Sequence, residues 1–87
     1  MNEKQLEILK ELNIDLNYFE LESHWHNHST YFQCCSMRIG KGQWLVILQD
    51  GALKFEDLNS NYNISNIVSK QEFYKKYKHH LKLSNFK

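Results

Sequence analysis

The sequence predicts an α+β fold in a single domain spanning residues 1–87, with a mostly antiparallel meander of four to five strands and a helix at each end. Three observations predict this class. Apolar residues recur at helical spacing near both termini, alternation with a period of two begins at Asn17, and glycine turns divide the middle of the chain. A chain of 87 residues supplies one small core, because about 64% of its unfolded surface can be buried at this size.

The N-terminal helix is predicted over residues 3–12. Leu6, Leu9 and Leu12 form its apolar stripe, with charged residues on the opposite side. Asn13 is suited to the left-handed conformation that ends a helix. So short a helix must pack on an apolar surface to be stable.

Alternation and turns predict the strands. The expected strands are residues 17–26, 30–39, 43–49 and 52–56, with Ile67-Val68 as a short edge strand. Phe19, Leu21 and Trp25 are expected to face the core, and Asp50-Gly51 is expected to form a two-residue hairpin turn. The polar residues 57–66 are expected to form a loop.

The C-terminal helix has the clearest predicted start. Ser69 and Glu72 have the spacing of a capping box, in which the serine oxygen accepts from the backbone N–H three residues later. Val68 and Phe73 are spaced for the accompanying hydrophobic contact. The residues expected to be buried are Phe73, Tyr77 and Leu81, and those expected to point away are Lys75, Lys76, Lys78 and Lys82.

Charge is distributed unevenly along the chain. Residues 1–22 carry a net charge of −4, residues 23–69 are neutral, and residues 70–87 carry +5. Such asymmetry indicates either a charged surface for a partner or mutual neutralisation of the two ends. The chain has ten lysines but only one arginine, Arg38, which argues against base-specific DNA recognition through arginine side chains.

The cysteines and the lack of long apolar runs indicate the compartment. Cys34 and Cys35 are adjacent and cannot form the disulfide framework of a small secreted protein. On a strand their side chains point to opposite faces, so we expect one in the core and one partly exposed. No apolar run approaches the roughly 20 residues of a membrane span. We therefore expect a cytoplasmic protein with no membrane partner and no cofactor.

A histidine-rich string offers a candidate metal site. His24, His26 and His28 alternate along a predicted strand and the turn after it, at a spacing that allows two imidazoles to chelate one zinc ion. A third ligand would have to come from elsewhere in the chain. No paired-cysteine or HExxH motif is present, so a solvent-facing strand with incidental histidines is the alternative interpretation.

A further pattern consists of Gly42-x-Trp44-Leu45-Val46, Asp50-Gly51, and Val68-Ser69-x-x-Glu72-Phe73-x-x-x-Tyr77. With these residues, the segment 39–78 resembles a module of small proteins from phages and mobile elements. The resemblance implies a hairpin packed on a serine-capped helix, and it transfers no catalytic residue. It also implies an accessory protein of a class that includes inhibitors of host defence, such as anti-CRISPR proteins.

These observations favour a non-enzymatic binding protein, phage-encoded, that occludes a surface of a host defence or nucleic-acid-processing protein in the bacterial cytoplasm. The candidate partner-binding residues are Glu20 and Glu22, which with Glu7 and Glu11 could imitate phosphates, and Lys75, Lys76 and Lys78, which could grip an acidic partner. One alternative is a nucleic-acid-binding protein that uses the C-terminal lysines. Another is a zinc-binding module at the histidine string.

The apolar run Trp44–Leu48 predicts a central strand covered on both faces. Two short helices leave little to cover the second face. The sequence therefore also predicts a homodimer through this strand.

Overall fold

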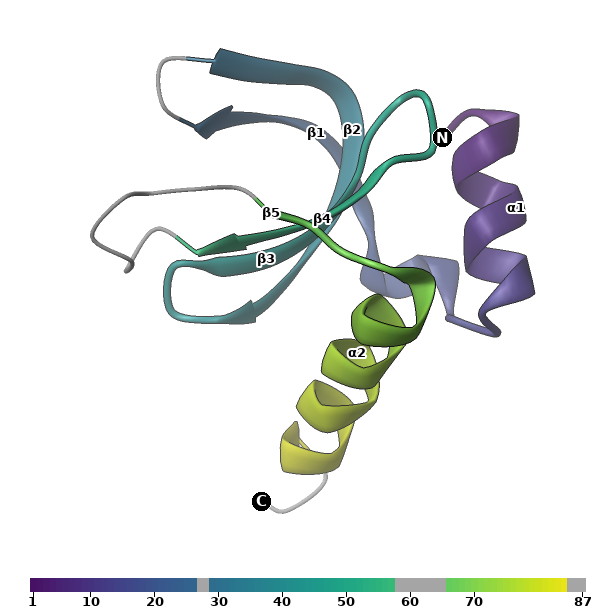
Figure 1. Ribbon diagram of the computed structural model, residues 1–87, viewed down its shortest axis with the longest axis vertical. Helices are drawn as coiled ribbons and strands as arrows, with labels where there is room; N and C mark the ends of the chain where they lie inside the picture. Colours follow the sequence, from purple (N-terminus) through teal and green to yellow (C-terminus); the bar gives the residue numbers. More distant parts are fainter. Residues whose placement is uncertain (27–28, 58–65, 85–87) are drawn as a thin grey trace.

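The computed structural model describes the backbone of residues 1–26, 29–57 and 66–84, and the side chains of residues 1–21, 34–57 and 67–82. It confirms the α+β fold, with one helix near each end and an antiparallel sheet between them (Figure 1). The elements in chain order are α1 (Glu3–Glu11), the 3-10 helix η1 (Leu16–Tyr18), β1 (Glu20–His26), β2 (Ser29–Gly40), β3 (Gln43–Ile47), β4 (Leu53–Asp57), β5 (Asn66–Ile67) and α2 (Lys70–Ser84).

The five strands follow one another in space as they do in sequence, and every neighbouring pair is antiparallel. The long strand β2 pairs with β3 only over Cys35–Gly40, so the rest of the β1–β2 hairpin extends beyond β3 (Figure 1). Predicted strands 30–39, 43–49 and 52–56 correspond to β2, β3 and β4 within two residues, and β5 lies one residue before its predicted position. The predicted loop over residues 57–66 lies mostly outside the described residues.

Both helices pack on the same face of the sheet. Leu9 from α1 and Phe73 and Tyr77 from α2 belong to one buried cluster with inward residues of β2, β3 and β4. The sheet residues of this cluster are Cys35, Met37, Leu45, Ile47 and Leu53. Phe19, which precedes β1, stacks on Phe73 with ring centroids 6.1 Å apart.

The opposite face of the sheet is also buried at its centre. Cys34, Ser36, Val46 and Glu56 lie on this face, and each is at most 3% exposed. The expectation that one cysteine would be partly exposed is therefore wrong, because β2 is covered on both faces where Cys34 and Cys35 lie. The prediction that β3 is covered on both faces is confirmed: Leu45, Val46 and Ile47 are all fully buried.

Helix α1 ends as expected but begins with an unpredicted cap. Asn13 adopts φ +55° just after the helix, as a left-handed stop requires. At the start, Asn2 Oδ1 accepts from the Gln5 N–H (2.9 Å) and Gln5 Oε1 accepts from the Asn2 N–H (3.0 Å). Gln5 is fully buried, whereas Leu6 of the predicted apolar stripe is 40% exposed.

The turn between β3 and β4 is longer than predicted. Leu48 and Ala52 still pair across it, the Gly51 N–H donates to the Leu48 carbonyl (2.9 Å), and among Leu48–Ala52 only Gly51 has positive φ, +91°. This is a three-residue loop closed by a left-handed glycine, not a two-residue turn. A Cβ on Gly51 would lie 3.3 Å from Ile8 Cδ1, because α1 stands against this turn (Figure 1).

The first strand begins later than predicted. Residues 16–18 form η1, since Asp15 accepts from the Asn17 N–H and caps this turn (2.9 Å). Leu21 was expected in the core but is 56% exposed, because it lies on the outer strand of the sheet. Neither described helix is both long enough and apolar enough to cross a membrane.

Candidate functional site

Helix α2 presents a buried stripe to the sheet and a cationic side away from it. The Ser69 Oγ accepts from the Glu72 N–H (3.1 Å), as the capping box predicts. Phe73 and Tyr77 are buried and Leu81 is half-buried, which confirms the predicted stripe. The position of this buried stripe on the helix determines which lysines lie beside the strands and which face solvent.

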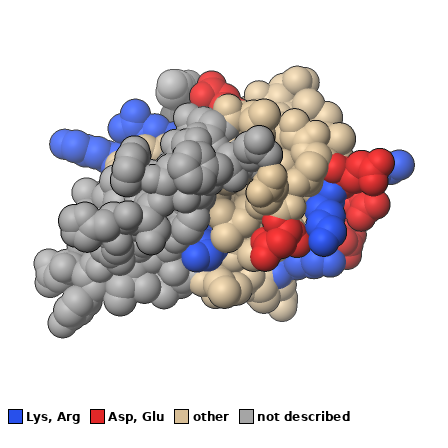
Figure 2. Space-filling model, turned by 90° about the horizontal axis from the view of Figure 1, so that it is seen from above, with Lys and Arg blue, Asp and Glu red and all other residues tan. Residues whose placement is uncertain are grey.

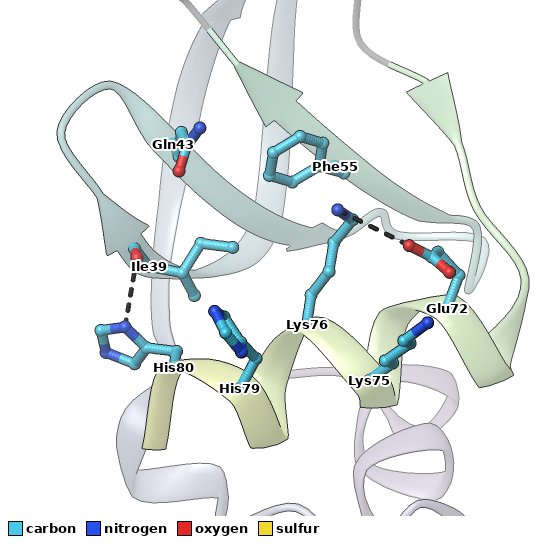
Figure 3. Close-up of a pocket in the computed structure, with 8 residues that line it drawn as sticks. All are labelled: Ile39, Gln43, Phe55, Glu72, Lys75, Lys76, His79 and His80. Atoms are coloured by element: carbon cyan, nitrogen blue, oxygen red, sulfur yellow. Dashed lines mark hydrogen bonds and ion pairs between the residues drawn. The ribbon is translucent and has the colours of Figure 1, made fainter. Parts of the chain in front are cut away.

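A cleft of about 410 Å³ lies between α2 and the strands it crosses. Its lining residues are Ile39, Gln43, Phe55, Glu72, Lys75, Lys76, His79 and His80 (Figure 3). The strands supply an apolar floor, Ile39 and Phe55, and the helix supplies five charged or imidazole side chains. We refer to these eight residues as the α2 cleft.

Lys76 crosses the α2 cleft instead of pointing away from the sheet as predicted. Its Nζ lies 4.2 Å from the centroid of the Phe55 ring and 3.6 Å from Glu72 Oε1 (Figure 3). The aromatic face attracts the cation, and Glu72 one turn earlier adds a helical ion pair. The ammonium group is thereby held over the apolar floor.

The two histidines of α2 have different environments. His80 Nδ1 lies 3.1 Å from the Ile39 carbonyl oxygen, a contact that joins the end of α2 to β2 (Figure 3). His79 is exposed and lies on the cleft side of the helix. A neutral imidazole both donates and accepts, so His79 can bind either kind of group on a ligand.

The remaining lysines of α2 are available to a partner. Lys75, Lys78 and Lys82 are exposed, and within the described part of the chain none of them has an ion pair. Lys78 Nζ lies 5.7 Å from the Tyr74 ring centroid, near the outer limit of a cation–π contact. Lys75 is the one of the three that lines the α2 cleft.

The acidic side chains do not form a comparable surface. Glu11 pairs with Lys70 at 2.8 Å, which confirms that the acidic first helix and the basic last helix partly neutralise each other. Seen from above, acidic and basic side chains are mixed on the right of the molecule, the side on which α1 lies (Figure 2). Glu7 is exposed on this helix but shares it with Lys4 and Lys10.

Glu20 lies apart from the lysines of the α2 cleft. It lines a second cleft, of about 470 Å³, formed with Tyr18, Ser36, Met37, Arg38, Trp44 and His80. The Glu22 side chain lies outside the described residues, although its backbone pairs with Cys34 in the sheet. The structure thus brings Lys75 and Lys76 into one cleft and does not bring Glu20 to it.

The histidine string can be placed only in part. His24 and His26 pair with Tyr31 and Ser29 along β1, but their side chains, and all of His28, lie outside the described residues. Among the side chains that the structure describes, no three histidines, cysteines or carboxylates gather as a metal site would require. The zinc hypothesis therefore stays a prediction.

The apolar floor of the α2 cleft, formed by Ile39 and Phe55, was not predicted from the sequence. Phe55 lies in the predicted strand 52–56 and packs against the core, but nothing in the sequence indicated that α2 would leave part of its ring open. Ile39 and Gln43 were predicted only as strand residues. Their position under α2 depends on the angle at which the helix crosses the sheet.

No family model matches this chain, and neither curated proteins nor solved structures yield a match.

Proposed function

We propose that this protein is a non-enzymatic binding protein that covers an acidic surface of a partner macromolecule with helix α2. The observation that carries the proposal is the α2 cleft, where the cations of Lys75 and Lys76 and the imidazole of His79 stand beside the apolar side chains of Ile39 and Phe55. This combination suits an acidic side chain flanked by an apolar one on a protein partner. Charge attracts and orients such a partner, and burial of apolar surface holds it.

The distribution of ion pairs favours the basic surface of α2 over the acidic surface of α1 as the binding surface. On α1 the carboxylate of Glu11 is already neutralised by Lys70, and lysines separate the other acids. On α2 three lysines remain without an ion pair among the described residues. Unpaired charge is what produces the long-range attraction that speeds association.

We further propose that the partner is a bacterial host protein of defence or nucleic-acid processing, and that the protein acts in the cytoplasm of that cell as a phage-encoded inhibitor. This part of the proposal is supported by the resemblance of residues 39–78 to accessory proteins of phages and mobile elements.

The test is a pull-down from bacterial lysate with the tagged 87-residue chain, with and without nuclease treatment. We expect a protein partner that survives the nuclease and is lost with the double variant Lys75→Glu, Lys78→Glu. Two charge reversals at a complementary interface should weaken binding by about tenfold or more. The matched control is Lys4→Glu, a reversal on an exposed residue of α1, which should retain the partner.

Two results would contradict the proposal. One is a partner retained equally by the double variant and the control while both melt at the wild-type temperature. The other is a partner lost on nuclease treatment, which would favour the alternative, nucleic-acid binding by Lys75, Lys78 and Lys82. In that case the logarithm of the affinity should fall with the logarithm of salt concentration, by roughly one unit of slope per phosphate contacted.

A further inference from the structure

Strand β1 forms one long edge of the sheet. It comprises seven residues, Glu20–His26, and among the described strands only β2 pairs with it. The other edge is β5, which is two residues long. A long edge strand exposes a row of backbone N–H and carbonyl groups that can pair with a further strand, and proteins normally protect such an edge.

The sequence of β1 has an unusual symmetry about its central residue, Ser23. An acidic, an apolar and an acidic residue precede it, and a histidine, an apolar residue and a histidine follow it. The full strand is Glu20-Leu21-Glu22-Ser23-His24-Trp25-His26. Reversed, the strand has the same pattern with imidazoles and carboxylates exchanged.

We propose that two copies of this chain form a dimer by antiparallel pairing of their β1 strands about a two-fold axis at Ser23. In this register every carboxylate of one copy stands opposite an imidazole of the other, and the two apolar residues stand opposite each other. The cross-strand pairs are Glu20 with His26, Glu22 with His24, and Leu21 with Trp25, each formed twice. Opposite-charge and aromatic pairs of this kind stabilise antiparallel strands, and a two-fold interface must be self-complementary.

The imidazoles need not be charged for these pairs to form. A neutral histidine carries one ring N–H, which can donate to a carboxylate, and a protonated one adds charge attraction. The proposed pairs can therefore form with either neutral or protonated imidazoles. No other register of two β1 strands matches all six Glu, His, Leu and Trp positions in this way.

The register shift between β1 and β2 adds no residue to β1. The β1–β2 ladder shifts register between Glu22 and His24, where β1 advances two residues and β2 advances three, from Cys34 to Tyr31. The additional residue is thus on β2. Strand β1 advances two residues between its paired positions Glu22 and His24, so Glu20, Glu22, His24 and His26 occupy alternate positions along the strand.

The surroundings of Leu21 support a second copy as the occupant. Leu21 is 56% exposed although it lies on the sheet face that the helices cover, opposite Cys35. Beside it is a cleft of about 330 Å³ lined by Met1, Asn2, Gln5 and Leu21. In the dimer, Trp25 of the second copy takes the register position opposite Leu21, and this pairing would remove exposed apolar surface of Leu21 from water.

This interface replaces the dimer predicted through Trp44–Leu48. Strand β3 is third of five in the sheet, so both of its edges are already paired, and Leu45–Ile47 have no exposed surface to offer. Pairing through β1 instead joins two five-stranded sheets into one continuous sheet. The inference does not depend on the proposed function, since it uses neither α2 nor the α2 cleft.

The first test is the mass of the 87-residue chain in solution, by sedimentation equilibrium at micromolar concentrations. We expect twice the chain mass of 10.5 kDa. A monomer mass up to the highest soluble concentration would overturn the proposal. The variant Leu21→Lys, at an exposed position, should weaken dimerisation by about tenfold while leaving the melting temperature of the monomer unchanged.

The second test locates the axis. In the proposed register Ser23 faces its own copy, with Cβ atoms about 4.5–5.5 Å apart, so Ser23→Cys should form an intermolecular disulfide under mild oxidation with little movement. The control Asn17→Cys, an exposed residue of η1, should stay uncrosslinked. The native Cys34 and Cys35 are fully buried and do not compete. Equal crosslinking of the variant and the control would overturn the register.

The third test uses complementary variants. Copies with Glu20→Lys and Glu22→Lys carry only basic groups on β1, and copies with His24→Glu and His26→Glu carry only acidic groups. Each variant alone should dimerise about tenfold to a hundredfold more weakly than the wild type, and an equimolar mixture should form a heterodimer. Folded variants that dimerise as well as the wild type, or a mixture that stays monomeric, would refute direct β1–β1 pairing.

Discussion

Gln5 occupies the buried side of α1, although glutamine is mostly an exposed residue. Its amide accounts for this position. The Nε2 group donates to the Ile47 carbonyl at the end of β3 (3.2 Å), and the Oε1 atom caps the helix at Asn2. The leucine stripe predicted the buried side of α1 only in part, because Gln5 is interior and hydrogen-bonded there, whereas Leu6 is 40% exposed.

The replacement Gln5→Leu keeps about the same volume and removes these hydrogen bonds. We expect the free energy of unfolding to fall by about 1–3 kcal/mol, because the Ile47 carbonyl and the Asn2 N–H lose partners. Urea denaturation measures the change. The control Glu7→Ala, at an exposed position on the same helix, should change it by no more than about 0.5 kcal/mol. Equal effects of the two variants would show that the Gln5 amide contributes nothing specific.

Cys34 and Cys35 are the second case in which burial decides the chemistry of a residue. Loss of hydration, helped by the neighbouring Cys34, raises the pKa of the Cys35 thiol from 9.0 to about 11. At neutral pH this thiol is protonated and a poor nucleophile. The adjacent cysteines therefore serve as small packing residues on the two faces of β2.

One measurement follows from the burial of both thiols, and a second follows from the raised pKa of Cys35. Neither thiol should react with a thiol reagent at pH 8 until the protein is unfolded. Because folding favours the protonated thiol, its contribution to stability is complete below about pH 9 and is lost as the pH rises towards 11. Comparing urea denaturation of the wild type and Cys35→Ala at pH 8 and pH 10.5 isolates this loss. Rapid labelling of folded protein at pH 8 would contradict the burial.

At the scale of elements, the sequence predicted the start of α2 more accurately than the start of β1. The start of α2 depends on Ser69, Val68 and Phe73, which lie within five residues of one another, so the sequence contains the whole cap. The start of β1 depends on the turn at η1 and on the burial of Phe19 against α2. That contact joins residues more than 50 positions apart, and alternation alone could not reveal it.

The cap of α2 can be tested directly. The variant Ser69→Ala removes the oxygen that accepts from the Glu72 N–H, and we expect it to lower the free energy of unfolding by about 1 kcal/mol. Thermal or urea denaturation measures it. The variant Gln71→Ala, at an exposed position in the first turn, should have an effect within about 0.5 kcal/mol of zero. A null result at Ser69 would mean that packing, not the cap, determines where α2 begins.

At the scale of the whole molecule, the main feature is a sheet that is buried on both faces at its centre. The helices cover the face of Leu45 and Ile47, and Val46 on the opposite face is equally inaccessible. A flat sheet with two helices on one side would expose Val46. The run Trp44–Leu48 did predict double burial, since consecutive apolar residues in a strand place apolar groups on both faces.

The variant Val46→Ala tests whether this second face is interior. We expect a loss of about 1–3 kcal/mol in the free energy of unfolding, as for truncation of a packed core side chain. The control Leu6→Ala removes a larger apolar group from a residue that is 40% exposed, and it should cost less. A smaller effect at Val46 than at Leu6 would show that this face is accessible to water.

The sequence by itself determined the fold class, the order of the elements, the cap of α2 and the separation of charge between the two ends, because each depends on residues close together in the chain. Only the tertiary structure decided that Gln5 is interior, that both cysteines are buried, that Lys76 lies over Phe55, and that β1 lies at an edge of the sheet. Each of these depends on how elements distant in sequence approach one another in space. Helical and strand periodicity do not specify that approach, since side-chain packing between elements determines it.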